Sequence, residues 1–214
     1  MDAGTRNAAF SALLLALFAV AGTGLVALTH ALTRERVLAN ERAVLERALH
    51  EVMPPEAHDN DLLADRIEVV SPELLGTRDP VPVHRARRGG RPVGVVLTPV
   101  APDGYNGRIR LIVGIYADGT VSGVRVLSHQ ETPGLGDGIE AGKSGWILGF
   151  TGRSLGDPPL ERWRVRRDGG DFDQLTGATI TPRAVVKAVR NALIYFRDHR
   201  DELFAAPAVE GEGR

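Results

Sequence analysis

Hydrophobic residues are distributed unevenly along the chain, and the longest run lies near the N-terminus. Residues 8–28 contain no ionisable side chain. About 20 apolar residues are enough for a helix to cross ~30 Å of hydrocarbon. A cleaved signal peptide is the alternative, because Arg6 precedes the run, but the run exceeds the usual ~7–15 residues and a charged helical pattern follows it. We therefore predict a retained transmembrane anchor over residues 1–32.

A helical pattern continues after the anchor, over residues 33–53. Apolar side chains recur there on one face of the expected helix, namely Val37, Leu38, Val44, Leu45, Leu49 and Val52. This stripe predicts a juxtamembrane helix that packs on its own domain, and docking on partner membrane subunits is the alternative. Met53-Pro54-Pro55 ends the helix, and the proline-rich residues 54–92 are predicted to be irregular.

The middle of the chain has the pattern of β-strands. Residues 93–100, 108–116 and 120–128 are rich in Val, Ile and Leu, and residues 102–107 between the first two have turn composition. Asp118-Gly119 is a two-residue hairpin signal between the last two strands. The pattern predicts an antiparallel hairpin within an α+β domain that spans residues 54–203.

The last periodic segment predicts a helix with one buried face, formed by Val185, Val186, Val189, Leu193 and Phe196. Thr181 is expected to cap it and Pro182 to occupy its first helical position. Residues 137–150 are expected to form a helix weakened by glycines, and residues 163–167 a strand with basic residues facing outward. Residues 204–214 are expected to be disordered.

Composition limits the chemistry that is available to this protein of 214 residues. Its net charge of −1 gives no indication of nucleic-acid binding. The chain contains no cysteine, which excludes disulfides, thiolate-held iron–sulfur clusters and thioether-linked haem. Its six histidines show no pair at helical ligand spacing, so no metal site is expected. An electron carrier in this chain would therefore be organic or held by histidine and carboxylate side chains.

Two motifs have residues suited to a large flat ligand. In Asp173-Gln-Leu-Thr-Gly-Ala-Thr179, the small Gly177-Ala178 pair allows close approach, and Thr179 lies beside a helix N-terminus that favours an anion such as phosphate. A helix-capping turn is the alternative. The second motif, His129-Gln-Glu-Thr-Pro-Gly-Leu-Gly136, could otherwise be a simple connection.

The first motif resembles the flavinylation signal Asp-x-x-Ser/Thr-Gly-Ala-Thr of FMN-binding domains. With the second motif, the anchor and Trp163-x-Val-x-x-Asp-Gly-Gly-Asp-Phe-Asp173, most of the chain resembles the G subunit of Rnf-type (Rsx) ion-translocating electron transport complexes. The C subunit of the Na⁺-translocating NADH:quinone reductase is related. The resemblance covers neither residues 54–92 nor the C-terminal tail.

The resemblance implies that a flavin transferase recognises Asp173 within its signal and esterifies Thr179 with the phosphate of FMN. Thr181 is the neighbouring hydroxyl that could be confused with it. We expect Glu131 and Thr132 to bind the polar edge of the flavin, and the glycines of the second motif to let the backbone approach its ring. The predicted cofactor-binding residues are Thr176, Gly177, Ala178, Thr179, Thr181, Glu131, Thr132, Leu135 and Gly136. Arg166 and Arg167 are expected to be solvated, with contact to the flavin phosphate as the alternative.

The implied function is that of a covalent-FMN electron carrier between ferredoxin and NAD, with no independent catalysis. Its implied partners are the other membrane and peripheral subunits of the complex. Arg34, Arg36 and Arg42 would favour a cytoplasmic domain, but the resemblance implies the periplasmic side of the bacterial inner membrane, and large domains translocate largely regardless of local charge. A membrane-tethered sensor or scaffold is one alternative. A hydrolase with a Thr nucleophile and His129 as a distal base is another.

Overall fold

The computed structural model describes residues 3–208, and the chain divides into two compact units that meet between Leu45 and Glu46. Helix α1, Ala3–Val52, joins the predicted anchor and the predicted juxtamembrane helix without a break. Its stretch Leu13–Arg34 is long and apolar enough to cross a membrane, and every side chain in it is exposed. This exposure separates the stretch from the buried core helix of a soluble protein, which has similar composition.

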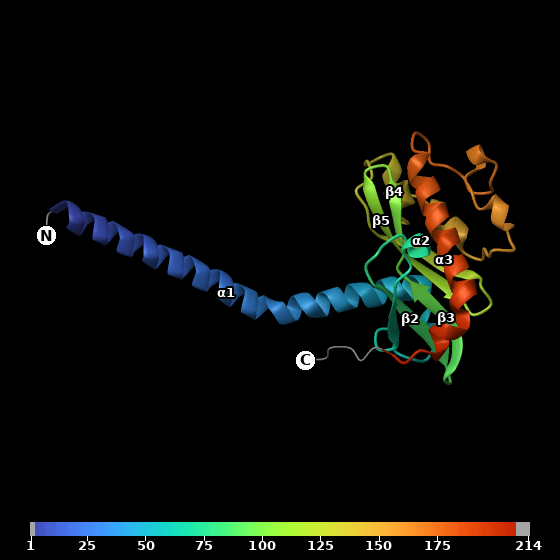
Figure 1. Ribbon diagram of the computed structural model, residues 1–214, viewed down its shortest axis with the longest axis horizontal. Helices are drawn as coiled ribbons and strands as arrows, with labels where there is room; N and C mark the ends of the chain where they lie inside the picture. Colours follow the sequence, from blue (N-terminus) through green and yellow to red (C-terminus); the bar gives the residue numbers. More distant parts are fainter. Residues whose placement is uncertain (1–2, 209–214) are drawn as a thin grey trace. The chain divides into compact units, whose positions relative to one another are not determined.

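The second unit is an α+β domain built on a six-stranded antiparallel sheet (Figure 1). β3 and β4 pair with successive parts of β5, while β6 pairs along the other edge of β5. The strands are β1 Arg66–Val69, β2 Val81–Arg88, β3 Arg91–Leu97, β4 Val100–Gly104, β5 Gly107–Tyr116 and β6 Val121–Ser128. The helices are α2 Pro72–Leu75 and α3 Ile180–Ala205, with 3₁₀ turns η1 Pro55–Ala57, η2 Gly136–Ile139, η3 Trp146–Phe150, η4 Leu160–Arg162 and η5 Arg166–Asp168.

The predicted central hairpin is confirmed in β5 and β6. Val113 lies opposite Val124 in this pair, and Asp118-Gly119 forms the turn. The Asp118 carboxylate accepts the Thr120 N–H at 2.9 Å, and Gly119 adopts a φ of +89° that a residue with a Cβ would rarely adopt. The dipeptide therefore specifies the hairpin for the reason expected from its sequence.

Other segments differ from the expectation. Residues 54–92 are not irregular, because they contain β1, α2 and β2. The prolines are tolerated where a strand starts or bulges: Pro82 is the second residue of β2, and Pro92 lies beside the register shift between β2 and β3.

Residues 102–107 are not only a turn, because they hold the end of β4 and the tip of a second hairpin. Residues 137–150 form two 3₁₀ turns rather than a helix, because three glycines weaken helical structure there.

The predicted strand at residues 163–167 is also wrong. Val165 makes only an isolated bridge to Phe172, and the chain turns at once into η5. Trp163 is buried, and its indole N–H donates to the carbonyls of Ser154 and Pro158. Together with Phe150 and Phe172 it forms an aromatic cluster with ring centroids 4.8–6.2 Å apart. This cluster supports the loops that lead to α3.

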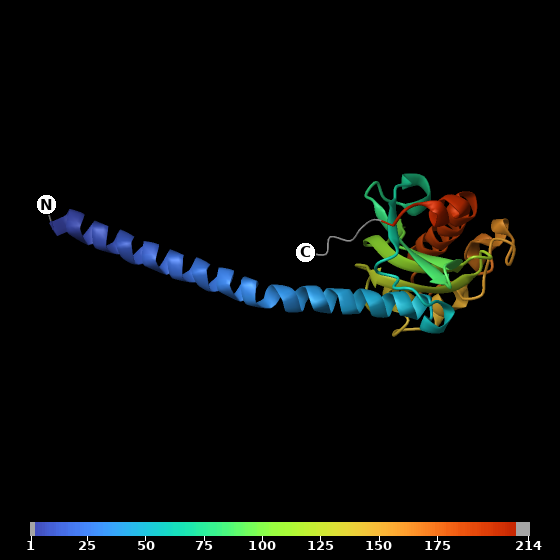
Figure 2. The ribbon, with the colours of Figure 1, turned by 90° about the horizontal axis from the view of Figure 1, so that it is seen from below.

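Two helical layers cover the sheet, as Figure 2 shows. α3 covers one face with its predicted buried residues, Val185, Val186, Val189, Leu193 and Phe196. The end of α1 packs on the opposite face, where Leu49 and Val52 are fully buried while Val44 is 58% exposed. The helix end fits because the strands there carry glycine: a Cβ on Gly114 would lie 2.4 Å from the Val52 carbonyl oxygen. The part of the juxtamembrane helix from Glu46 onward therefore packs on its own domain.

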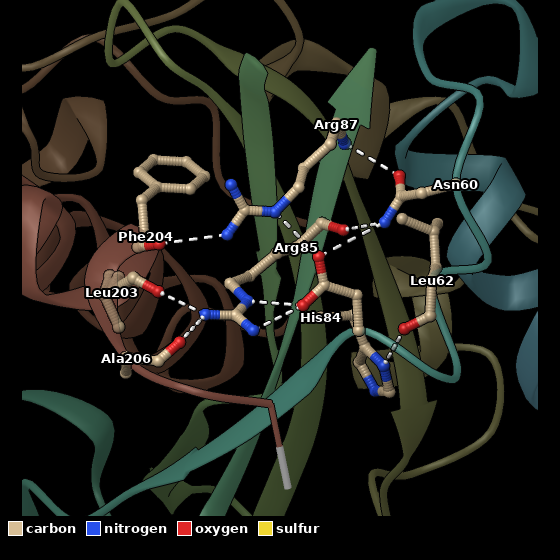
Figure 3. Close-up of polar contacts among 9 residues, drawn as sticks. Asn60, Leu62, His84, Arg85, Arg87, Leu203, Phe204 and Ala206 are labelled. Atoms are coloured by element: carbon tan, nitrogen blue, oxygen red, sulfur yellow. Dashed lines mark hydrogen bonds and ion pairs between the residues drawn. The ribbon is translucent and has the colours of Figure 1, made fainter. Parts of the chain in front are cut away.

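The C-terminal end of α3 is fixed to β2 by a partly buried ionic network (Figure 3). Arg85 is 3% exposed and binds Asp65 through its Nε at 2.7 Å, and Arg87 binds the other oxygen of the same carboxylate at 2.8 Å. Both guanidinium groups also donate to carbonyls at the helix end, those of Leu203, Phe204 and Ala206. The ordered structure thus continues past the expected boundary at 204, and residues 209–214 of the predicted tail lie outside the described part of the chain.

His84 lies beside this network and is buried. Its Nδ1–H donates to the Leu62 carbonyl at 2.8 Å (Figure 3). Burial lowers the pKa of His84, because the charged imidazolium loses its hydration in the interior, and the hydrogen bond to Leu62 opposes this only in part. The folded domain therefore favours the neutral imidazole.

Candidate functional site

One cavity of about 340 Å³ lies among three segments that are far apart in the sequence. They are the tip of the β4–β5 hairpin, the loop that follows β6, and the turn that leads into α3. The cavity is lined by Tyr105, Glu131, Thr132, Leu135, Gly136, Gly177, Ala178, Ile180 and Thr181. All of these except Tyr105 and Ile180 are predicted cofactor-binding residues. The fold therefore brings the two sequence motifs together around one space.

Glu131 is the buried polar group of this cavity, with only 4% of its surface exposed. One carboxylate oxygen accepts the backbone N–H of Asn106 at 3.0 Å, and the other accepts the hydroxyl of Thr181. Burial of a carboxylate is costly unless hydrogen bonds replace its water, and both oxygens have such a partner here. Glu131 thus connects the hairpin tip to the start of α3.

The helix start differs from the expectation. α3 begins at Ile180, so Thr179 rather than Thr181 occupies the N-cap position. Thr181 lies in the first turn, is 1% exposed, and donates its hydroxyl to Glu131. Thr179 is half-buried, and its side chain makes no capping hydrogen bond. A local cap was predicted, but a partner 50 residues away in sequence takes the Thr181 hydroxyl instead.

The turn before α3 explains the small residues of the first motif. The Ala178 N–H donates to the Leu175 carbonyl at 3.1 Å, which places Thr176 and Gly177 at the centre of a β-turn. Gly177 has a φ of +77°, and a Cβ on it would lie 2.9 Å from a methyl group of Leu135. Glycine is therefore required by backbone conformation and also by the approach of the second motif.

The second motif folds back on itself beside Glu131. The N–H groups of Leu135 and Gly136 both donate to the Thr132 carbonyl at 3.1 Å. A Cβ on Gly136 would lie 2.9 Å from a carboxylate oxygen of Glu131, so this glycine allows the loop to reach the carboxylate. The Leu135 side chain is 46% exposed at the cavity. The loop thus supplies an apolar side chain together with a buried carboxylate.

Three predicted residues, Asp173, Thr176 and Thr179, are not among the residues that line the cavity, although Thr179 lies in the sequence between the lining residues Ala178 and Ile180. Thr176 is exposed at the turn. Asp173 is 64% exposed and pairs with Arg166 at 2.9 Å, and its backbone carbonyl accepts the indole N–H of Trp146 at 2.7 Å. These contacts attach the flavinylation-like segment to the body of the domain and leave the Asp173 carboxylate accessible.

The arginines near the start of α3 are engaged with carboxylates. Arg183 donates two hydrogen bonds to Asp168, at 2.5 and 2.6 Å, and these bonds lower the pKa of the Asp168 carboxyl although partial burial opposes them. Arg166 is paired with Asp173, and the Arg167 backbone N–H donates to the Gln174 side chain at 3.2 Å. The guanidinium groups of Arg166 and Arg183 are thus already paired, which favours the expected solvated face.

His129 is also engaged. Its Nδ1 accepts the Glu131 N–H at 3.0 Å, and its Nε2 donates to the Glu140 carboxylate at 2.8 Å. Both ring nitrogens therefore have partners other than Thr179. A nucleophilic hydroxyl needs a base within hydrogen-bond reach, so these contacts argue against the hydrolase alternative.

Sequence reasoning missed Tyr105 and Ile180. Tyr105 was included in a turn, and the aromatic side chain between Gly104 and Gly107 was the signal that could have found it. Ile180 directly follows the first motif and is 45% exposed, which is unusual for isoleucine at the start of a helix that buries most of its other apolar residues. Both extend the apolar part of the cavity lining.

Two family models and several known proteins match this chain. Residues 104–194 match the family model of the FMN-binding domain, and residues 1–52 match that of the RnfG N-terminal region. A Pseudomonas aeruginosa protein (strain UCBPP-PA14) is 50% identical over 212 residues, which cover 99% of each chain. A Vibrio atlanticus protein (strain LGP32) is 51% identical over 195 residues, 91% of this chain and 93% of the relative. Both relatives are named as the G subunit of an ion-translocating oxidoreductase complex.

The chain belongs to the family of G subunits of ion-translocating oxidoreductase complexes. As a member of this family, it works with other subunits in a redox complex, and its N-terminal helix fits a membrane-anchored protein. The match to the FMN-binding domain begins at the tip of the β4–β5 hairpin and includes every residue that lines the cavity.

The cavity of this G subunit also fits FMN in size and chemistry. Ligand sites are typically ~300–1,000 Å³, apolar for the most part, with a few polar groups that fix orientation. Here Tyr105, Leu135 and Ile180 supply apolar surface, and the polar groups are Glu131 and the two threonines at positions 132 and 181. Gly177 has no side chain that would compete with Leu135 for space at the cavity.

Proposed function

We propose that this protein carries FMN covalently on Thr179 and relays electrons within an ion-translocating oxidoreductase complex, without catalysis of its own. The observation that carries the proposal is the convergence of both motifs on one cavity beside Thr179, at the N-terminus of a 26-residue helix. Bound FMN supplies the redox chemistry, while the protein supplies position and electrostatics. The resemblance of this chain to the G subunit of Rnf-type complexes supports an electron path between ferredoxin and NAD.

The hydroxyl groups support Thr179 over its neighbour as the attachment residue. Thr181 is 1% exposed and donates its hydroxyl to Glu131, so esterification there would require that bond to break. Thr179 is half-buried and makes no capping bond, which leaves its oxygen available. In the proposed modification, Thr179 Oγ1 forms a bond to the flavin-side phosphorus of a flavin dinucleotide, the phosphoanhydride bond breaks, the other half leaves as a nucleoside monophosphate, and the hydroxyl proton is released to water.

The surroundings of Thr179 suit a phosphoester. The first N–H groups of α3 have no partner within the helix and favour a negative charge by ~0.3–1 kcal/mol. That amount orients the phosphate but would not retain the cofactor, which is the reason for a covalent bond. A short tether gives an effective concentration on the order of millimolar, so the cavity stays filled where free FMN is scarce.

The proposed location is the periplasmic side of the bacterial inner membrane, with α1 as a single-pass anchor. Two further partners follow. A flavin transferase modifies Thr179 after recognising the segment around Asp173, whose carboxylate is 64% exposed. Membrane subunits of the complex exchange electrons with the flavin. The domain itself then comprises residues 54–203 together with the end of α1 that packs on it.

Flavin fluorescence after denaturation tests the proposal. The full chain is co-produced with a flavin transferase beside Thr179→Val and, as a matched control, Thr151→Val, because Thr151 is exposed and lies outside both the motif and the cavity lining. We expect fluorescence that survives denaturing electrophoresis in the parent and in Thr151→Val, and none in Thr179→Val. A parent band without fluorescence would leave the sensor or scaffold interpretation in its place.

A further inference from the structure

Three large apolar side chains gather at the cavity although they are exposed. Tyr105 is 64% exposed, Leu135 46% and Ile180 45%, and each comes from a different segment. Single exposed apolar residues are normal on a protein surface, but a cluster that lines a cavity marks a binding surface. Among these three, Tyr105 is the only aromatic residue and the most exposed.

The tip that carries Tyr105 is held in place from two sides. Tyr105 and Asn106 form a two-residue turn between Gly104 and Gly107, which pair across the hairpin. The Asn106 backbone N–H donates to Glu131 at 3.0 Å, and its side-chain amide donates to the Thr132 hydroxyl at 3.1 Å. An exposed tyrosine on a free hairpin tip would sample many positions, whereas this tip is joined to the second motif.

The base of the same tip is joined to α3. Lys187 pairs with Asp103 at 2.6 Å, two residues before Tyr105. This exposed ion pair contributes little to stability by itself. It adds a second connection, however, so that the tip is linked to both the loop and the helix that border the cavity.

We propose that Tyr105 packs on the isoalloxazine ring of the FMN and sets its redox potential. This inference rests on the proposed function, because it requires flavin in this cavity. An aromatic pair in contact shifts an equilibrium by about 2- to 13-fold, in addition to the effect of the surface area that the pair buries. Oxidised flavin is planar and electron-poor and packs well on an electron-rich phenol, whereas the reduced ring is electron-rich and gains less. Tyr105 therefore stabilises the oxidised state and lowers the potential.

The preference for oxidised flavin sets the size of the expected shift in redox potential. A tenfold difference in the affinity of the site for the two oxidation states corresponds to about 30 mV for a two-electron couple. Removal of the ring in Tyr105→Leu is expected to raise the midpoint potential by about 10–30 mV, the range that a 2- to 13-fold shift gives. Flavin fluorescence should rise as well, because a phenol in contact quenches the excited flavin by electron donation.

The experiment uses the full, FMN-loaded chain in detergent, with intact mass to establish loading of each variant. Tyr105→Leu is compared with Tyr105→Phe, which keeps an aromatic ring, and with Tyr116→Leu, the same change at the other end of β5 and outside the cavity lining. We expect the largest rise in potential and brighter fluorescence in Tyr105→Leu, a smaller rise in potential in Tyr105→Phe, whose ring is less electron-rich than a phenol, and the parental potential in Tyr116→Leu. A loaded Tyr105→Leu with parental potential and fluorescence would overturn the inference alone. A parent chain that gains no FMN mass would overturn the proposed function and this inference with it.

Discussion

Thr179 and Thr181 are two residues apart, but the Thr181 hydroxyl donates to Glu131 whereas Thr179 makes no capping hydrogen bond, so the same substitution in each should affect stability unequally. Thr181→Val keeps the shape of a buried side chain but removes the hydroxyl that Glu131 accepts. Hydrogen bonds to charged groups contribute about 1.5–3 kcal/mol. Thr179→Val removes no capping bond, and substitutions of that kind stay within about 0.5 kcal/mol.

These free energies predict a measurable difference in thermal unfolding. For domains of this size 1 kcal/mol shifts Tm by about 2–4 °C, so Thr181→Val should lower Tm by about 3–12 °C and Thr179→Val by less than about 2 °C. The assay is thermal unfolding of the full chain without FMN, in detergent, followed by circular dichroism. The reasoning is refuted if Thr179→Val lowers Tm as much as Thr181→Val does, because Thr179 would then hold the helix start.

Three further results are expected. Gly177→Ala should reduce stability by about 1–2 kcal/mol, because alanine disfavours a φ of +77°, whereas Gly142→Ala, in open space, should not; thermal unfolding compares them. Arg85→Met should cost about 1–3 kcal/mol, because the carbonyls of Leu203 and Ala206 lose their donor and Asp65 keeps only Arg87, and a Tm equal to the parent's would contradict the role of the network at the end of α3. Because burial lowers the pKa of His84, the unfolded state binds its proton more readily, so stability should fall below about pH 6.5 by up to about 1.4 kcal/mol per pH unit. Urea unfolding at pH 7.5 and 5.5 should show a smaller loss in His84→Gln, and an equal loss would exclude His84 as its source.

The sequence could predict features that depend on local pattern. The Asp118-Gly119 hairpin and the buried face of α3 follow from periodicity and turn chemistry, which few tertiary contacts override. The long apolar run likewise required no knowledge of the fold. The prediction that residues 54–92 are irregular was wrong because Pro82 and Pro92 lie at a strand start and beside a bulge. The sequence does not show which backbone N–H groups of a strand pair with a neighbour, and so it does not show where proline is tolerated.

Features of the site that depend on distant contacts were harder to predict. Thr181 has every property of an N-cap, yet Glu131 takes its hydroxyl from a loop 50 residues away. Tyr105 has the sequence environment of a turn, and its place at the cavity depends on how Asn106 meets the second motif. The motifs themselves were found because residue type and spacing carry them, but their convergence on one cavity required the fold.

The central claim is the covalent bond between FMN and Thr179, and peptide mass spectrometry tests it most directly. Trypsin cleavage after Arg167 and Arg183 releases residues 168–183, which contain Thr176, Thr179 and Thr181. From protein co-produced with a flavin transferase, we predict that this peptide carries one FMN, with fragment ions that assign the added mass to Thr179. An unmodified peptide, or an added mass assigned to Thr176 or Thr181, would contradict the account.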